Sequence, residues 1–503
     1  MGQYLLGLDA GNTVIKAVIF DLTGRELASS ACEGHSRMDR PGHVERDLNE
    51  LWRNAQGVIR TCIDKAGIAA NEIAAIGCAG HGNGLYALDR QGAPLLGIQS
   101  LDTRASQLVD EFAASGVGDL THPISQQRPW PSQTPTLLAW LKRFDPDRFA
   151  RIGTVLLCKD FIVNRLTGER VSEVSDVSGC GLLNMVERRY DPALMQAYGL
   201  GDSMDLLPRL IESDDIAGHV TSEAAVATGL AVGTLVVGGL FDVIASAIGS
   251  GVTRTGAASI IAGTWSINQV ITARPTLDGP VFMSSSFDRT RYMAMENSAT
   301  SAANLEWMVR ELFGHGDEGV SPFDQCCNLA ASVAPEFSAP FYHPFLYGAQ
   351  TDGNARAGFH GVAGWHTKAH LMRAVLEGVV FGHRWHIERL RAAGADFREA
   401  VLSGGGSRSR IWPQIFADVL GVPVTVARSR ETGALGAAIA AGTGAGLFAD
   451  FTAGADAMVQ TDRHYVPDPA LADLYEQRYR IYRDISDAMT PIWKRMAALG
   501  VAA

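Results

Sequence analysis

Close to its start, the chain carries an apolar run that ends at one aspartate, a polar turn that contains glycine, and a second apolar run. The segment is Leu6–Asp21, with Asp9 ending the first run, Gly11-Asn12-Thr13 in the turn and Lys16 after it. This order is typical of a β-hairpin with a polar tip. Backbone amides at such a tip can surround phosphate oxygens, and a carboxylate can hold a divalent cation beside them. A plain hairpin with a solvated turn fits the segment as well.

The same pattern returns in the second half of the chain. In Ala258–Ile271 an apolar run meets Gly263-Thr264, and a further apolar run follows. Two phosphate-type hairpins half a chain apart indicate a duplicated domain that faces itself across a cleft. The length of 503 residues agrees, because a chain of this size is too long for one hydrophobic core.

The net charge of the chain argues against some classes of binding partner. The formal net charge of -11 argues against nucleic acid and anionic membrane surfaces, since both favour a basic patch. No apolar run approaches the ~20 residues that span a bilayer, and the chain starts without a basic, cleavable leader pattern. The seven scattered cysteines form no C-x-x-C pair, which indicates reduced thiols. We therefore expect a cytoplasmic protein that binds neither nucleic acid nor membrane.

A third pattern, Val236–Gly249, places an apolar strand before Gly238-Gly239 and puts Asp242 at the start of an expected helix of small residues. An aspartate at the start of a helix is often its N-cap. A carboxylate there can also accept a proton from a substrate hydroxyl, and the helix amino terminus favours its ionised form. The residues alone leave both interpretations open.

Two further patterns lie near the end of the chain. An apolar run leads into the three glycines of Ser403–Trp412, and Glu431–Ala438 is rich in small residues. Glycines let the backbone approach a flat base or a phosphate closely, although strand-to-helix turns with glycine are common. The chain has no P-loop, no Rossmann glycine motif after a strand and no zinc-binding motif.

In their order along the chain, the five motifs resemble those of the FGGY family of carbohydrate kinases, within the sugar kinase, actin and Hsp70 superfamily. The resemblance implies an α/β fold of two RNase H-like domains around a central cleft, with a sugar-binding domain over 1–247 and an ATP-binding domain over 248–503. It implies that Asp242 is the catalytic base and that Asp9 holds Mg²⁺, through water, beside ATP. The residues it assigns to ATP are Gly11, Asn12, Thr13, Lys16, Gly263, Thr264, Gly404, Gly405 and Ser409.

Polar residues that follow an expected strand over 73–78 are the candidates for binding the sugar. The resemblance places His81 and Asn83 where xylulokinases have Gln-Met-His-Gly, and Asp102 and Arg104 where they have Trp-Asn-Asp-x-Arg. Together with Asp242, these residues would hydrogen-bond substrate hydroxyls. A surface ion pair is the alternative for Asp102 and Arg104.

Ser100 stands where those xylulokinases have tryptophan, which argues against plain D-xylulose as the substrate. The motifs look closest to the L-xylulose (3-keto-L-gulonate) kinase branch. We therefore expect an ATP-dependent kinase of a small ketose, of the xylulose type. Another polyol or sugar substrate (erythritol, ribulose or glycerol), a non-catalytic sugar sensor and an Hsp70-like ATPase are the alternatives. A stripe of Tyr475, Tyr479, Tyr482 and Ile485 on a C-terminal helix indicates core or partner packing, and a homodimer is left open.

Overall fold

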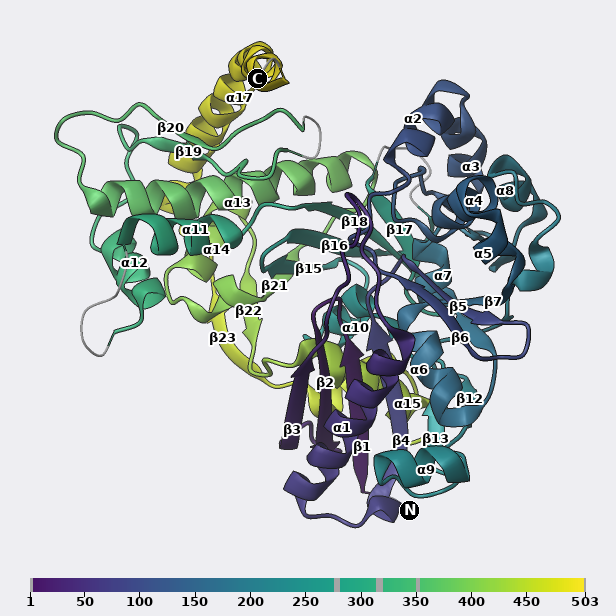
Figure 1. The fold of residues 1–503 in the computed structure, drawn as a ribbon. Helices are drawn as coiled ribbons and strands as arrows, with labels where there is room; N and C mark the ends of the chain where they lie inside the picture. The colour runs from purple at the N-terminus through teal and green to yellow at the C-terminus, as the bar shows by residue number, and fades with distance from the viewer. Residues whose placement is uncertain (1–2, 276–280, 314–319, 350–352, 502–503) are drawn as a thin grey trace.

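The computed structural model describes residues 3–275, 281–313, 320–349 and 353–501. The chain folds into two lobes, each built around a mixed sheet of seven strands (Figure 1). The N-terminal sheet has the order β12-β13-β4-β1-β2-β3, with β14 also paired to β4. Its strands are β1 (Tyr4–Ala10), β2 (Val14–Asp21), β3 (Glu26–Glu33), β4 (Ile73–Gly80), β12 (Ile216–His219), β13 (Leu235–Val237) and β14 (Leu240–Phe241).

The C-terminal sheet repeats this plan in the order β17-β18-β16-β15-β21-β22-β23. In each sheet a hairpin of two antiparallel strands continues into a parallel pair, β1 with β4 and β15 with β21. The duplication and the two-domain α/β fold expected from the sequence are thus confirmed. The strands are β15 (Ala257–Ala262), β16 (Ser266–Thr272), β17 (Met283–Ser286), β18 (Tyr292–Ser298), β21 (Glu399–Ser403), β22 (Val424–Ala427) and β23 (Thr461–Tyr465).

Helices α10 (Asp242–Gly249) and α15 (Thr432–Gly444) lie between the two sheets and pack on each other. Helix α15 also packs directly on β1 and β4 of the N-terminal sheet. A Cβ added to Gly7 of β1 would lie 1.9 Å from the carbonyl oxygen of Ala434, so glycine is needed for this close approach. The domain boundary predicted between residues 247 and 248 falls inside α10, and it stays a prediction.

Smaller elements surround the N-terminal sheet. Helix α1 (Leu48–Ala66) begins at the N-cap Asp47 and ends at Gly67, and it contains the apolar stripe of the sequence. The other elements are β5 (Leu85–Asp89), β6 (Pro94–Ile98), β7 (Ile152–Leu156), β8 (Val171–Glu173), β9 (Leu183–Asn184), β10 (Arg189–Tyr190), β11 (Arg209–Ile211), α2 (Ser106–Ala114), α3 (Val117–Ser125), α4 (Thr134–Phe144), α5 (Pro146–Ala150), α6 (Cys158–Thr167), α7 (Val174–Gly179), α8 (Pro192–Ala197) and α9 (Ser222–Thr228).

The C-terminal lobe contains two long helices, α13 (Lys368–Ala392) and α17 (Ala472–Val501). Tyr475, Tyr479 and Tyr482 of α17 are buried, and their rings contact Phe381 of α13, so the tyrosine stripe is core packing. The remaining elements of this lobe are α11 (Ala303–Met308), α12 (Pro322–Ala331), α14 (Trp412–Leu420), α16 (Phe451–Met458), β19 (Phe341–His343) and β20 (Gly358–His360).

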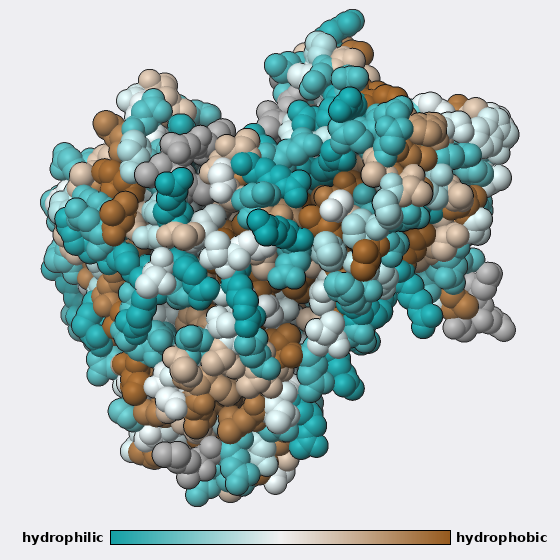
Figure 2. All heavy atoms as spheres, turned by 180° about the vertical axis from the view of Figure 1, so that it is seen from behind, coloured by the Kyte–Doolittle hydropathy of each residue, from teal (hydrophilic) through white to brown (hydrophobic). Residues whose placement is uncertain are grey.

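Hydrophilic residues cover much of the face that Figure 2 shows. On the face opposite to that of Figure 1, hydrophobic residues form smaller groups among hydrophilic ones (Figure 2). Scattered exposed apolar side chains are normal on folded proteins. Within the described ranges, no helix is both long enough and apolar enough to cross a membrane.

Candidate active site

Strand register brings three of the predicted residues to one edge of the N-terminal sheet. Ala10 of β1 pairs with Gly80 of β4, and Gly80 pairs with Phe241 of β14. All three strands are parallel at this point, so the same edge carries Asp9, His81 and Asp242, each one residue from this row. The sheet therefore joins residues that lie far apart in the sequence.

Asp242 is the first residue of α10, and the N-cap position belongs to Phe241. This geometry therefore does not favour the alternative that Asp242 serves as the N-cap of its helix. Burial, and after it the negative charge of Asp9, raises the pKa of Asp242 to about 8. A carboxyl group with a pKa near neutrality can accept a proton at physiological pH more readily than an ordinary aspartate.

Asp9 lies at the end of β1, and its environment suits a bound cation. Burial raises the pKa of Asp9 to about 6, the charge of Lys16 opposes this shift, and that of Glu431 adds to it. Since Asp9 and Asp242 repel each other, a divalent cation between phosphate oxygens and these carboxylates would relieve an unfavourable charge. No group of three or more His, Cys, Asp or Glu side chains in the described ranges forms a metal site by itself. The residues thus fit Mg²⁺ that arrives with a nucleotide.

The glycine-rich turn after β21 meets the tip of the second hairpin. Gly404 has a φ of 83°, and its backbone lies against Ala262 and Gly263. A cavity of about 450 Å³ opens beside this turn. Its lining includes Gly404, Gly405, Arg408, Arg428, Arg430 and Arg463. This cavity has the size and the charge expected for a nucleotide.

Three residues predicted to bind ATP, Lys16, Thr264 and Ser409, have partners within the protein. The hydroxyl of Ser409 accepts hydrogen bonds from the backbone N–H groups of Ile411 and Trp412, at 3.3 and 3.2 Å, just before α14. Lys16 Nζ lies 2.8 Å from Oε2 of Glu431. Thr264 stands at the hairpin tip, where its carbonyl accepts a hydrogen bond from Ser301 N at 3.2 Å.

His81 and Asn83 are both buried beside the sheet edge. His81 Nε2 lies 2.8 Å from the hydroxyl of Tyr86, and burial lowers the pKa of His81 to about 4, so the ring is neutral. Asn83 has a φ of 63°, a left-handed backbone conformation that is rare outside glycine. Its Oδ1 is buried and has no hydrogen-bond partner in the described part of the chain. A strained residue with an unused acceptor suits the binding of a substrate hydroxyl.

Asp102 and Arg104 form a buried pair, so the surface alternative is wrong. The guanidinium of Arg104 contacts both oxygens of Asp102, at 2.9 and 2.8 Å, and also Oε1 of Glu45 at 2.9 Å. The Asp102 carboxylate accepts further hydrogen bonds from the backbone N–H groups of Val44 and Arg104. Because its acceptor positions are engaged, a sugar hydroxyl would have to displace one of these donors. Sugar binding by this pair stays a prediction.

Ser100 contacts the first hairpin rather than leaving an empty space. Its Oγ accepts a hydrogen bond from Nδ2 of Asn12 at 2.9 Å. Gln99 Nε2 donates to the carbonyl of Asn12 at 2.7 Å. The residue that replaces tryptophan therefore holds the hairpin tip next to the predicted sugar residues.

Sequence reasoning missed several buried cations, and one of them, Arg46, contacts the first hairpin. Arg46 is 3% exposed, and its Nη1 donates to the carbonyl oxygen of Gly11 at 3.0 Å. Its Nε and Nη2 have no hydrogen-bond partner among the described residues. In one sequence, a single arginine between Val44-Glu45 and the helix N-cap Asp47 gives no indication of a functional role. Its place behind the hairpin tip depends on the fold.

Comparison with known proteins decides the family. The N-terminal domain of the FGGY family of carbohydrate kinases matches residues 4–249, and the C-terminal domain of that family matches residues 258–445. The chain belongs to the FGGY family of carbohydrate kinases. This FGGY kinase is thus a sugar phosphotransferase, as the motifs predicted.

Relatives agree over the full length. The FGGY kinase is 34% identical to an L-xylulose/3-keto-L-gulonate kinase of Escherichia coli, over 97% of this chain and 98% of that protein. Its structure is similar to that of a xylulose kinase from Rhodospirillum rubrum, with a TM-score of 0.90, 28% identity and coverage of 98% and 100% of the two chains. A Plasmodium falciparum glycerol kinase with ADP has the same fold, with a TM-score of 0.85, 18% identity and coverage of 97% and 98%.

Proposed function

We propose that this FGGY kinase transfers the γ-phosphoryl group of ATP to a hydroxyl of a small ketose, of the xylulose type. The observation that carries this proposal is the common sheet edge of Asp9, His81 and Asp242, with Asp242 holding a pKa of about 8. Phosphoryl transfer needs in-line positioning, charge neutralisation and a group that takes the hydroxyl proton. At this sheet edge, His81 would position the sugar, Asp9 would hold the cation that neutralises phosphate charge, and Asp242 would take the proton.

In the proposed reaction, Asp242 accepts the proton of the sugar hydroxyl. The hydroxyl oxygen then forms a bond to the γ-phosphorus while the bond from that phosphorus to the bridging oxygen breaks, and ADP leaves. His81 and Asn83 orient the sugar, and the two hairpin tips and the Gly404 turn hold ATP. Mg²⁺ beside Asp9 would supply charge neutralisation of the phosphates. Closure of the lobes would exclude water, which would otherwise compete with the sugar.

The substrate is proposed from the relatives and from one departure in sequence. The E. coli relative is named as an L-xylulose/3-keto-L-gulonate kinase, and Ser100 replaces the tryptophan of xylulokinases. We therefore place L-xylulose first and 3-keto-L-gulonate second among the substrates to test. D-xylulose, ribulose, erythritol and glycerol serve as alternatives within the same reaction class.

A coupled assay of ADP release tests the proposal with this panel. We expect ADP release to require a sugar, and kcat/KM for L-xylulose to exceed that for D-xylulose. A tenfold preference for D-xylulose, equivalent to ~1.4 kcal/mol, would contradict the substrate proposal and leave the kinase intact. ATP hydrolysis that is fast without sugar and unchanged by every sugar would contradict the kinase. Sugar binding without any ADP release would favour the sensor.

The seven cysteines are free thiols, which supports action in the reducing cytoplasm. The proposed partners are a small sugar and ATP, with neither nucleic acid nor a membrane. A homodimer remains a proposal, and light scattering of the purified chain measures it directly.

A further inference from the structure

The turn that precedes Asp242 is held by hydrogen bonds at three backbone positions. Gly238 N donates to the carbonyl of Asp215 at 2.9 Å, and Gly239 N donates to that of Ser213 at 3.0 Å. Phe241 N donates to Oγ of Ser175 at 3.0 Å. Since Phe241 is the N-cap residue of α10, the Ser175 hydroxyl holds the backbone of the residue directly before Asp242.

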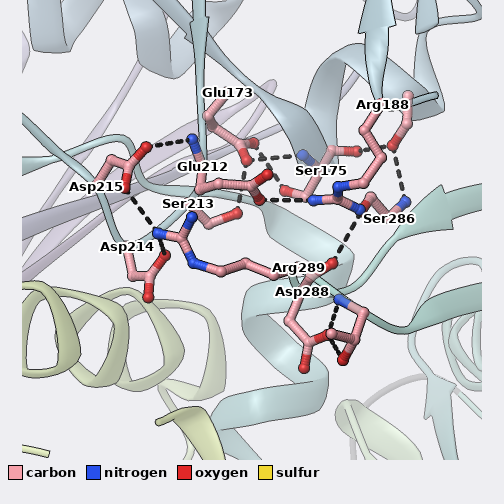
Figure 3. A network of polar contacts seen from close by, with 12 residues as sticks. Glu173, Ser175, Arg188, Glu212, Ser213, Asp214, Asp215, Ser286, Asp288 and Arg289 are labelled. Atoms are coloured by element: carbon pink, nitrogen blue, oxygen red, sulfur yellow. Dashed lines mark hydrogen bonds and ion pairs between the residues drawn. The ribbon is translucent and has the colours of Figure 1, made fainter. Parts of the chain in front are cut away.

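One buried carboxylate joins these supports. Glu173 Oε1 accepts from Ser175 Oγ at 2.7 Å, and Glu173 Oε2 accepts from Ser213 Oγ at 2.7 Å. Figure 3 shows Glu173 between Ser175 and Ser213. Glu212 and Asp215 lie on the same segment as Ser213. Because its hydrogen donates to Glu173, the Ser175 hydroxyl presents a lone pair to the Phe241 amide. The geometry of the turn thus depends on the orientation of one serine.

A strand of the C-terminal sheet contacts Ser175. Ser285 of β17 donates from Oγ to the carbonyl oxygen of Ser175 at 2.5 Å. Ser286 N donates to Oγ of Ser178 at 2.8 Å. These four serines are buried and connect the edge strand of the C-terminal sheet to α7 of the N-terminal lobe.

An ion-pair cluster lies beside the serines. Arg188 contacts Ser286 and pairs with Glu212 Oε2 at 2.6 Å, and Arg289 pairs with Asp214 and Asp215 at 2.9 and 2.7 Å (Figure 3). The Arg289 pairs are half-exposed and contribute little to stability. They nevertheless tie the β17–β18 turn to the segment that supports Gly238 and Gly239.

We propose that Ser175 is a positioning residue for Asp242, and that Ser285 couples it to the C-terminal sheet. The approach of the two sheets then sets the orientation of Asp242 and its separation from Asp9. This inference rests on the proposed role of Asp242 as the base. It adds a route by which domain position controls catalysis without a contact between Ser285 and either substrate.

The test compares three serine variants in the full-length enzyme. Ser175→Ala removes the acceptor of the Phe241 amide, and Ser285→Ala removes the link from β17. Ser284→Ala is the matched control, because Ser284 lies in the same strand, is fully buried, and its hydroxyl has no hydrogen-bond partner among the residues that the structure describes. The rescue variant is Ser175→Thr, which keeps the hydroxyl.

We expect kcat to fall roughly tenfold in Ser175→Ala and several-fold in Ser285→Ala, within the range of losses from misplaced catalytic groups, with both KM values within about twofold. The double variant should be no slower than Ser175→Ala, since both changes act through one contact. Thr at position 175 should restore most of the rate.

Amide hydrogen exchange at Phe241 gives a readout that does not depend on turnover. Exchange should accelerate in Ser175→Ala, to a smaller extent in Ser285→Ala, and not in Ser284→Ala. Unchanged kcat and unchanged exchange in Ser175→Ala would overturn the inference. Equal losses in Ser284→Ala and Ser285→Ala would overturn the coupling and assign the effect to strand packing. An unmodified enzyme without sugar-dependent ADP release would instead refute the proposed function, and exchange would still decide the positioning of the turn.

Discussion

Lys16 Nζ lies 2.8 Å from Oε2 of Glu431, which connects the first hairpin to the residue before α15. The two side chains are 37% and 24% exposed, so solvent screens the pair. Lys16, which the sequence predicts to bind ATP, is thus already paired with a carboxylate of the other lobe. A bound triphosphate would compete with Glu431 for Lys16, or would share it.

Replacing Lys16 by methionine distinguishes its contribution to stability, through the ion pair with Glu431, from its contribution to ATP binding. We expect the free energy of unfolding to change by about 1 kcal/mol or less, as for other exposed pairs. The KM for ATP should rise roughly tenfold, as for loss of one charge-assisted contact, with KM for the sugar within about twofold. Steady-state kinetics and thermal unfolding measure both effects. Glu431→Gln is the control, and it should leave KM for ATP unchanged or lower it. An unchanged KM for ATP in Lys16→Met would remove Lys16 from the nucleotide site.

Asp242→Asn removes the proposed base and keeps the size of the side chain. We expect kcat to fall by roughly 10² or more, in line with general-base contributions, while the sugar still binds. Coupled kinetics and sugar titration by calorimetry measure the two quantities. Near-normal turnover of a folded Asp242→Asn enzyme would end the assignment of Asp242 as the base.

The raised pKa of Asp242 also predicts how stability depends on pH. The folded protein holds a proton on this carboxyl up to about pH 8, whereas an unfolded aspartate releases it near its ordinary pKa of 3.8. The unfolded state therefore binds fewer protons between these values, and the free energy of unfolding falls as pH rises through this window. The melting temperature of Asp242→Asn should fall less than that of the unmodified enzyme from about pH 5 to about pH 8. Parallel pH profiles of the two proteins would disagree with a raised pKa.

The buried cation Arg46 gives a fourth prediction. Arg46 has a single hydrogen bond, to the carbonyl oxygen of Gly11, and forms no ion pair in the described part of the chain. Burying such a charge is costly, so Arg46→Met should keep or raise the melting temperature. Activity should nevertheless fall tenfold or more, because the charge stands behind the hairpin tip, where phosphate is expected. A variant that is stable and fully active would show that Arg46 has no electrostatic role.

Asp102→Asn tests whether the buried pair with Arg104 is a support or a sugar ligand. Breaking a buried ion pair typically costs about 3–5 kcal/mol, and the contact of Arg104 with Glu45 at 2.9 Å would remain to offset part of this loss. We expect a large fall in the melting temperature, with KM for the sugar little changed in the protein that remains folded. Arg37→Ala is the control, since Arg37 and Asp39 are 65% and 70% exposed and should contribute little. A large rise in sugar KM without loss of stability would restore the substrate role.

Local patterns were sufficient for several parts of the site. The hairpin around Gly11, the turn before Asp242 and the glycines at Gly404 could be predicted because strand periodicity and glycine positions are properties of short segments. Repetition of the hairpin predicted the duplicated fold in the same way. These features place Asp9 and Asp242 at strand ends without knowledge of their neighbours.

Only the tertiary structure decided which side chains share a charge environment. Lys16 and Glu431 are 415 residues apart in sequence, and Asp102 and Arg104 turned inward rather than to the surface. Burial of Arg46, the orphaned oxygen of Asn83 and the serine contacts behind Asp242 likewise arise where separate elements meet. Local periodicity cannot predict them, because desolvation and hydrogen-bond partners depend on the packing of distant segments.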